Sequence, residues 1–152
     1  MNLEVGTLLR WDNFPWPRYG IGIKPRWFIY LGDTGPFAQV TFVYLATTTT
    51  QIAHFQSGGI RAGHSHFKFE SRQFTIFDED CIIDFDDRPY AIEKDKLLNR
   101  QTALEVKGKL NEQTLRMIYN HFLRSGVLSK MEMLDLHTSF NNGGITSLKK
   151  PK

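Results

Sequence analysis

Three histidines lie close together in the sequence and have side chains suited to acid–base or metal chemistry. His64 and His66 are two residues apart, so on an extended strand both rings point to one face, a spacing compatible with a pair of metal ligands. No carboxylate or cysteine completes a recognised metal-binding pattern beside them, so we predict no metal. Because imidazole titrates near neutral pH, proton transfer is the role we favour for this group, which includes His54. The simplest interpretation leaves at least one ring as a solvated loop residue.

Residues 56–63 combine three glycines with Arg61, as loops that cradle phosphate do. The segment lacks the Walker spacing and the Lys-Ser/Thr pair that follows it in nucleotide-hydrolysing proteins. Nucleotide hydrolysis is therefore not supported.

Acidic residues cluster between positions 78 and 87, and we interpret them as a solvated turn face rather than a catalytic pair. The alternative is a negative edge that repels nucleic acid. The cluster consists of Asp78, Glu79, Asp80, Asp84, Asp86 and Asp87.

Composition indicates one soluble domain. The 152 residues are 41% apolar and 23% charged, and the net charge of +3 permits an RNA partner. No apolar run approaches the roughly 20 residues that span a bilayer, and the first residues lack a signal-peptide pattern. The single cysteine, Cys81, cannot form an internal disulfide and is predicted to be a small buried hydrophobe. We therefore expect a cytoplasmic location and no membrane partner.

Runs of β-branched and aromatic residues predict the elements that must position this chemistry. The run over 24–32 predicts a strand buried on both faces, and the turn residues at 33–36 join it to the next strand in a hairpin. The predicted strands cover 6–12, 24–32, 40–46, 66–70, 74–77 and 81–85. The loop over 13–22, with Trp16 and Arg18, is interpreted either as a binding lip or as a cover for the edge of the sheet.

The second half of the chain changes to helical patterns. Residues 92–98 can form a short helix, and a longer one is predicted after Asn111, an N-cap residue, with an apolar stripe that ends before Gly126. Ser129 and Glu132 have capping-box spacing and predict a last helix that ends near His137. Residues 141–152 are predicted to be a frayed basic tail.

Five segments occur in an order that resembles the MazF/PemK-type toxin family across roughly residues 5–124. They resemble the family's opening strand, its arginine-proline motif before an apolar strand, its threonine-x-glutamine strand end, a strand with a basic-leucine segment, and the start of its closing helix. In this chain they cover 6–15, 24–30, 45–51, 81–97 and 108–115.

This resemblance implies a mainly β fold with C-terminal helices, built as a small SH3-like barrel. Residues 1–125 are expected to form that barrel with its closing helix, 126–140 an additional short helix, and 141–152 a flexible tail. The family implies a homodimeric endoribonuclease toxin that cleaves single-stranded RNA through 2′-hydroxyl attack, uses no metal or cofactor, and is countered by an antitoxin protein.

By position, the family's catalytic threonine corresponds to Thr49 and its catalytic arginine to Lys24. Lysine keeps the positive charge but loses the planar fork that suits phosphate oxygens. Arg26, two residues further on and on the same strand face, is one candidate substitute, and Arg18 or Arg10 is the alternative. The expected RNA contacts are Trp16, Arg18, Thr50, Gln51, Arg61 and His64. Because Lys24 replaces the arginine, the alternative is a non-catalytic barrel that binds nucleic acid or protein. A third hypothesis is a structural or regulatory partner in a phage or mobile-element operon.

Overall fold

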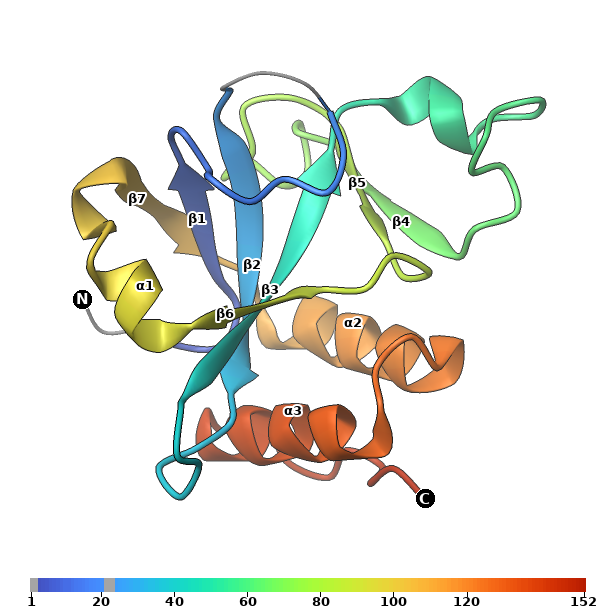
Figure 1. The fold of residues 1–152 in the computed structure, drawn as a ribbon. Helices are drawn as coiled ribbons and strands as arrows, with labels where there is room; N and C mark the ends of the chain where they lie inside the picture. Colours follow the sequence, from blue (N-terminus) through green and yellow to red (C-terminus); the bar gives the residue numbers. More distant parts are fainter. Residues whose placement is uncertain (1–2, 21–23) are drawn as a thin grey trace.

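The computed structural model describes residues 3–20 and 24–152, which fold into one antiparallel sheet and three α-helices (Figure 1). Positions 21 and 22 of the predicted 13–22 loop, and the first two residues of the N-terminal segment, lie outside this range. The strands are β1 (Thr7–Trp11), β2 (Arg26–Asp33), β3 (Phe42–Thr49), β4 (His66–Phe69), β5 (Cys81–Asp84), β6 (Tyr90–Glu93) and β7 (Leu104–Lys109). The α-helices are α1 (Lys94–Leu98), α2 (Glu112–Ser125) and α3 (Lys130–Asn142), and short 3-10 turns cover Ile52–Phe55 and Gln101–Ala103.

The sheet branches at β3. Its order is β4-β5-β3-β2-β1-β7, and β6 also pairs with β3. The first half of β3 pairs with β6, as in Leu45 opposite Tyr90, whereas its second half pairs with β5, as in Thr48 opposite Ile83. The described strands β4 and β7 end the path without pairing to each other, so the sheet is open. The prediction of a mainly β fold with C-terminal helices is confirmed at this level.

Strand β2 is buried on both faces, as its uninterrupted apolar sequence predicts. Successive side chains of a strand point to opposite faces. Ile29 and Leu31 therefore belong to a core between the sheet and helices α2 and α3, while Phe28 and Tyr30 belong to a second core, on the α1 side of the sheet. The sheet is the middle layer of the molecule, with apolar material on each side.

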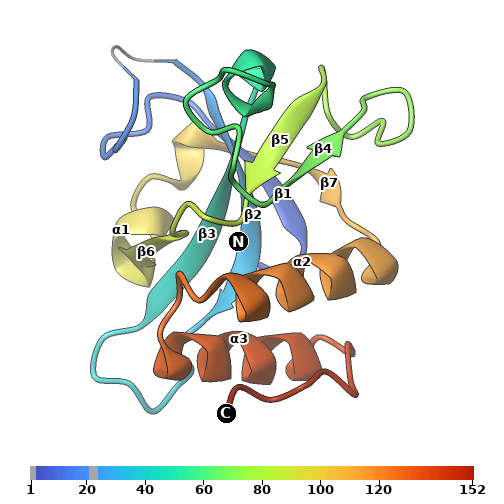
Figure 2. The ribbon, with the colours of Figure 1, turned by 90° about the vertical axis from the view of Figure 1, so that its right-hand side faces the viewer.

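Helices α2 and α3 form the layer below the sheet and lie side by side (Figure 2). The predicted caps are confirmed: the Asn111 side chain accepts a hydrogen bond from the Thr114 amide, and Ser129 and Glu132 form a reciprocal capping box. Each cap satisfies backbone groups that the first helical turn leaves unpaired. Helix α3 continues past the predicted end at His137 and stops at Asn142.

A close contact fixes α3 against the end of β2. A Cβ on Gly32, whose φ is +129°, would lie 2.3 Å from the Cβ of Ser139. The Ser139 hydroxyl accepts a hydrogen bond from the Asp33 amide at 3.1 Å. The absence of a side chain at position 32 therefore lets the helix reach the strand.

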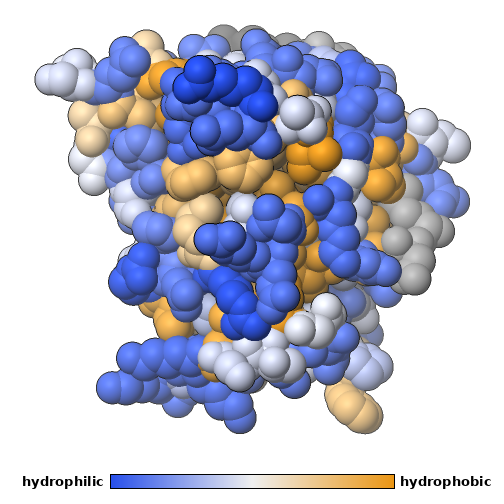
Figure 3. All heavy atoms as spheres, turned by 180° about the vertical axis from the view of Figure 1, so that it is seen from behind, coloured by the Kyte–Doolittle hydropathy of each residue, from blue (hydrophilic) through white to orange (hydrophobic). Residues whose placement is uncertain are grey.

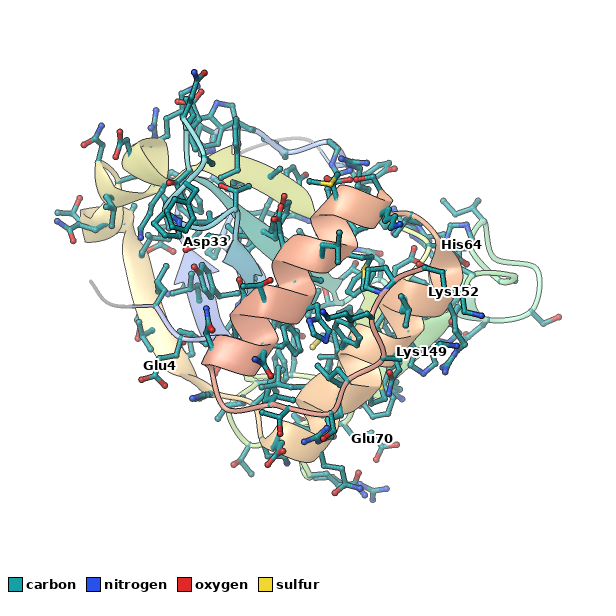
Figure 4. All side chains as sticks on the ribbon, turned by 90° about the horizontal axis from the view of Figure 1, so that it is seen from below. Glu4, Asp33, His64, Glu70, Lys149 and Lys152 are labelled. Atoms are coloured by element: carbon teal, nitrogen blue, oxygen red, sulfur yellow. The ribbon has the colours of Figure 1, made fainter. Side chains whose placement is uncertain are left out.

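The predicted tail over 141–152 is wrong for most of its length, because the segment packs back on the helices (Figure 4). Ile145 is buried in the core. Three backbone carbonyls of the segment accept hydrogen bonds from side chains of α2 and α3: Arg116 donates to Thr146, Tyr119 to Lys149, and the His137 ring contacts the Leu148 oxygen at 3.2 Å. These bonds hold a sequence whose composition alone suggests fraying.

Three local predictions also differ from the structure. Residues 74–77 form turns rather than a strand: the Phe74 amide donates to the Glu70 carbonyl and the Phe77 amide to the Phe74 carbonyl, while both rings pack on Phe69. The segment predicted as a helix from 92 begins as β6, and helix starts only at Lys94. Edge strand β7 was not predicted.

The face opposite to that of Figure 1 has apolar surface near its centre, bordered by hydrophilic residues (Figure 3). Among the described residues, none of the helices is both long and apolar enough to cross a membrane.

Candidate active site

A cavity of about 410 Å³ lies where β2 begins and β3 ends. We call it the central cavity. Its lining joins basic, acidic, hydroxyl and aromatic side chains that are far apart in the sequence. They are Arg10, Tyr19, Lys24, Pro25, Arg26, Trp27, Thr47, Thr48, Thr49, Thr50, Arg61, Phe77, Asp78, Glu79, Cys81, Ile82, Asp84, Asp87 and Tyr90.

Arg26 and Thr49 lie at the ends of β2 and β3 that border the central cavity. The last β2–β3 pair before these ends is Phe28 with Thr47, two residues from each of them. Both side chains line the central cavity, as does Lys24. All three residues predicted to be catalytic therefore come together.

Arg26 and Lys24 supply positive charge that no carboxylate neutralises. Among the ion pairs of the described residues, neither side chain has an acidic partner, whereas Arg10 contacts both Asp12 and Glu105 at 3.6 Å. Within the part of the chain that the structure describes, Arg26 donates one hydrogen bond, to the Tyr19 carbonyl at 2.9 Å, and the guanidinium has further N–H donors for a ligand. An anion that enters the cavity thus meets two available cations.

The Thr49 hydroxyl is oriented by the backbone amide two residues further along the chain. Its oxygen accepts a hydrogen bond from the Gln51 amide at 3.1 Å. A hydroxyl has one proton to donate in addition to its acceptor sites, so this arrangement leaves the Thr49 proton for a ligand. Thr50 lines the cavity as well, whereas the exposed Gln51 does not.

Arg61 and His64 both contact the buried carboxylate of Asp84. The Asp84 carboxylate is only 4% exposed, with one oxygen 2.8 Å from the His64 ring and 3.3 Å from the Arg61 guanidinium. Its other oxygen accepts from the Asp86 amide at 2.9 Å. The prediction that Asp84 belongs to a solvated face is therefore wrong. Arg61 lines the cavity with its charge already paired, and His64 is not a lining residue.

The potential ligand atoms of His64, Asp84 and Asp86 all lie within 4.8 Å of one another, a spacing that could suit a metal. The sequence did not indicate that these carboxylates lie beside His64. However, both Asp84 oxygens already accept hydrogen bonds, and the Arg61 cation beside them opposes a divalent ion. The His66 ring is directed to the His64 carbonyl at 2.8 Å rather than toward the His64 ring.

Asp87 is the carboxyl group best suited to accept a proton in the cavity. Its side chain is 14% exposed, and its nearest cation is Arg18 at 3.9 Å. Burial raises the pKa of Asp87 above the ordinary value, with the negative charge of Asp84 adding to the effect. A carboxylate whose negative charge is buried in this way takes up a proton more readily than a carboxylate in water.

Two predicted RNA contacts, Arg18 and Trp16, are not lining residues, although Arg18 packs against two residues that are, Asp87 and Tyr90. The Arg18 guanidinium stacks on the Tyr90 ring, 4.0 Å from its centre, and donates to the Arg88 carbonyl. Trp16 packs on Trp11 and Phe14, with the Arg100 guanidinium 4.7 Å from its ring centre. Neither side chain is a lining residue, so loop 13–20 covers the second core at these positions.

Cys81 lines the cavity as an inert group. Burial raises the pKa of its thiol to about 12, so the thiol stays protonated near neutral pH. This agrees with its interpretation as a small hydrophobe.

Sequence reasoning missed Tyr19 and Asp87 as members of the site. Tyr19 falls in a loop already recognised as aromatic, which was the available signal, whereas nothing local distinguishes Asp87 from the other five acidic residues around it. No family model, curated protein or solved structure matches the chain.

Proposed function

We propose that this protein is a metal-independent endoribonuclease that cleaves single-stranded RNA in the central cavity. The observation that carries the proposal is that Arg26, Lys24 and Thr49 line one cavity, and that neither cation forms an ion pair among the described residues. Phosphodiester cleavage needs positive charge and hydrogen-bond donors at the phosphoryl oxygens, where negative charge increases in the transition state. This site offers a guanidinium, an ammonium and a hydroxyl in one place.

In the proposed reaction, the ribose 2′-hydroxyl loses its proton to the Asp87 carboxylate, and the oxygen attacks the adjacent phosphorus. Arg26 and Thr49 donate hydrogen bonds to the phosphoryl oxygens while the bond to the 5′-oxygen breaks. The leaving oxygen takes a proton from solvent. The products are a 2′,3′-cyclic phosphate and a 5′-hydroxyl, and no external oxidant, metal or cofactor enters the balance.

Arg26 takes the main phosphate-binding role in this proposal, and Lys24 adds charge. Guanidinium can bind two oxygens at once, whereas an exposed ammonium acts as a single charge. The acidic residues Asp78 and Glu79 also line the cavity, so a phosphate is expected on the side of Lys24 and Arg26.

We infer further that the chain is a toxin of the MazF/PemK type with a variant of the family's SH3-like barrel. The order of its sequence segments supports this, together with the branching of β3 between β5 and β6, which bends the sheet. The proposal includes a homodimer, a cytoplasmic location and an antitoxin partner that covers the cationic side of the cavity.

The test is incubation of the purified protein with a long RNA in the presence of EDTA. The proposal predicts discrete fragments with 2′,3′-cyclic phosphate and 5′-hydroxyl ends. Intact RNA, or cleavage that EDTA abolishes, would refute metal-independent cleavage.

The acidic lining favours one second candidate, a non-catalytic module that binds a protein or nucleic acid. Asp78 and Glu79, without ion pairs among the described residues, could meet cations of a protein partner while Lys24 and Arg26 meet its acids. Binding without cleavage in the same assay would favour this candidate.

A further inference from the structure

We propose that the Tyr19 ring is a stacking platform for an unpaired RNA base next to the phosphate held in the central cavity. The inference rests on the proposed RNA substrate and adds a residue that recognises it. The inferred substrate is therefore single-stranded RNA, whose bases are not held in a duplex.

The ring is built into the site rather than loosely attached. The Arg61 guanidinium lies 4.8 Å from the centre of the Tyr19 ring and 5.8 Å from that of Phe55. Arg61 is itself fixed by the buried carboxylate of Asp84. A cation over one face of an aromatic ring attracts it electrostatically, so Arg61 supports Tyr19 from within the protein.

A second contact fixes the backbone of the same residue. Arg26 donates to the Tyr19 carbonyl at 2.9 Å, which ties the position of the ring to the proposed phosphate-binding group. A ligand whose phosphate contacts Arg26 therefore has the Tyr19 ring as its neighbour.

The ring also offers surface to a ligand. Tyr19 is 55% exposed and lines the central cavity. Every nucleobase has an aromatic face, so stacking on tyrosine tolerates many base identities. A paired base inside a helix has both faces covered by its neighbours and cannot use such a platform without first leaving the stack.

Binding of uncleavable ligands separates this role from catalysis. The probes are a random-sequence pool of 2′-O-methyl hexanucleotides, in which the attacking hydroxyl is blocked, and a hexamer of abasic 2′-O-methyl ribose phosphates with the same charge. The variants are Tyr19→Ala, Tyr19→Phe and, as a matched control, Phe37→Ala, which removes a fully exposed ring elsewhere.

We expect Tyr19→Ala to bind the base-containing pool about 5- to 150-fold more weakly and the abasic hexamer with unchanged affinity. Tyr19→Phe and Phe37→Ala should bind both probes like the wild type. Unchanged binding of the pool by Tyr19→Ala, or an equal loss for both probes, would overturn the stacking role while leaving the RNA substrate in place. Failure of the wild type to bind either probe would overturn the RNA substrate as well.

Discussion

Arg26 at the start of β2 donates a hydrogen bond to the backbone carbonyl of Tyr19 across 2.9 Å. The bond orients the guanidinium without neutralising it, because a carbonyl carries no net charge. Arg61, by contrast, is held by the Asp84 carboxylate at 3.3 Å. An arginine held by a neutral carbonyl keeps its charge for an anionic group, and Thr49 lines the same cavity.

Replacement of Arg26 by alanine should lower the cleavage rate about 10²- to 10³-fold, the usual effect of removing a donor to a developing oxyanion. The cleavage rate of Arg26→Lys should lie between those of the wild type and Arg26→Ala, since lysine keeps the charge and loses the guanidinium fork. Arg72→Ala is the control, because Arg72 is 82% exposed and its ion-pair partner is Glu70, away from the cavity. Single-turnover rates on one RNA, with thermal unfolding as a check on folding, decide the outcome. Equal losses in Arg26→Ala and Arg72→Ala would point to nonspecific charge rather than a site.

Thr49 should act through its hydroxyl. Thr49→Val keeps the shape and the β-branch but cannot donate a proton to a phosphate, so we expect cleavage to fall by about 10-fold or more. Thr49→Ser should retain most of the rate. A valine variant as active as the serine variant would exclude the hydroxyl from the reaction.

Asp87→Asn should have opposite effects on activity and stability. Loss of the proton acceptor is expected to slow cleavage about 10²-fold. Because burial raises the pKa of Asp87 in the folded protein, its ionised form destabilises the fold, and the stability it provides when protonated is lost as pH rises through that pKa. The variant should therefore have a higher urea midpoint than the wild type at pH 7. The difference should vanish below the ordinary aspartate pKa of about 3.9, where both side chains are neutral.

A urea midpoint at pH 7 that is lower in Asp87→Asn would show that the contact with Arg18 outweighs the cost of burial. Glu70→Gln, at a partly exposed acid away from the cavity, provides the comparison.

The C-terminal helix should be part of the cooperative core. Phe140 of α3 is fully buried, so Phe140→Ala is expected to lower the free energy of unfolding by about 3–5 kcal/mol. Met131→Ala on the same helix should change it by less than about 0.5 kcal/mol, since Met131 is 68% exposed. Urea unfolding followed by far-UV circular dichroism measures both. A small effect of Phe140→Ala would mean that α3 unfolds separately from the sheet.

Features with a local cause could be predicted from the sequence. The caps at Asn111 and Ser129 depend on side chains that bond within three residues, and the β2–β3 hairpin depends on the turn that joins its strands. The expectation that Arg26 and Thr49 belong to one site came from the family resemblance, because the strand predicted from the sequence ended at residue 46, whereas β3 continues to Thr49.

Features that depend on distant segments could not be predicted. Asp84 is buried because Arg61, 23 positions earlier, and His64 fold over it, and its sequence neighbours give no sign of this. Edge strand β7 alternates charged residues with few apolar ones, and its Val106 is 54% exposed, so its hydrophobic pattern is weak. The final segment is held by bonds to its carbonyl oxygens, which are the same in every sequence.

The most direct test of the central claim is a double-mutant cycle on Arg26 and Thr49. Single-turnover cleavage of one RNA in EDTA is measured for the wild type, Arg26→Ala, Thr49→Val and the double variant. If both groups donate to the same phosphate, the double variant should lose much less than the product of the two single losses, because groups that act as a unit are not additive. Losses that multiply independently, or a folded Arg26→Ala protein that cleaves at the wild-type rate, would contradict the account.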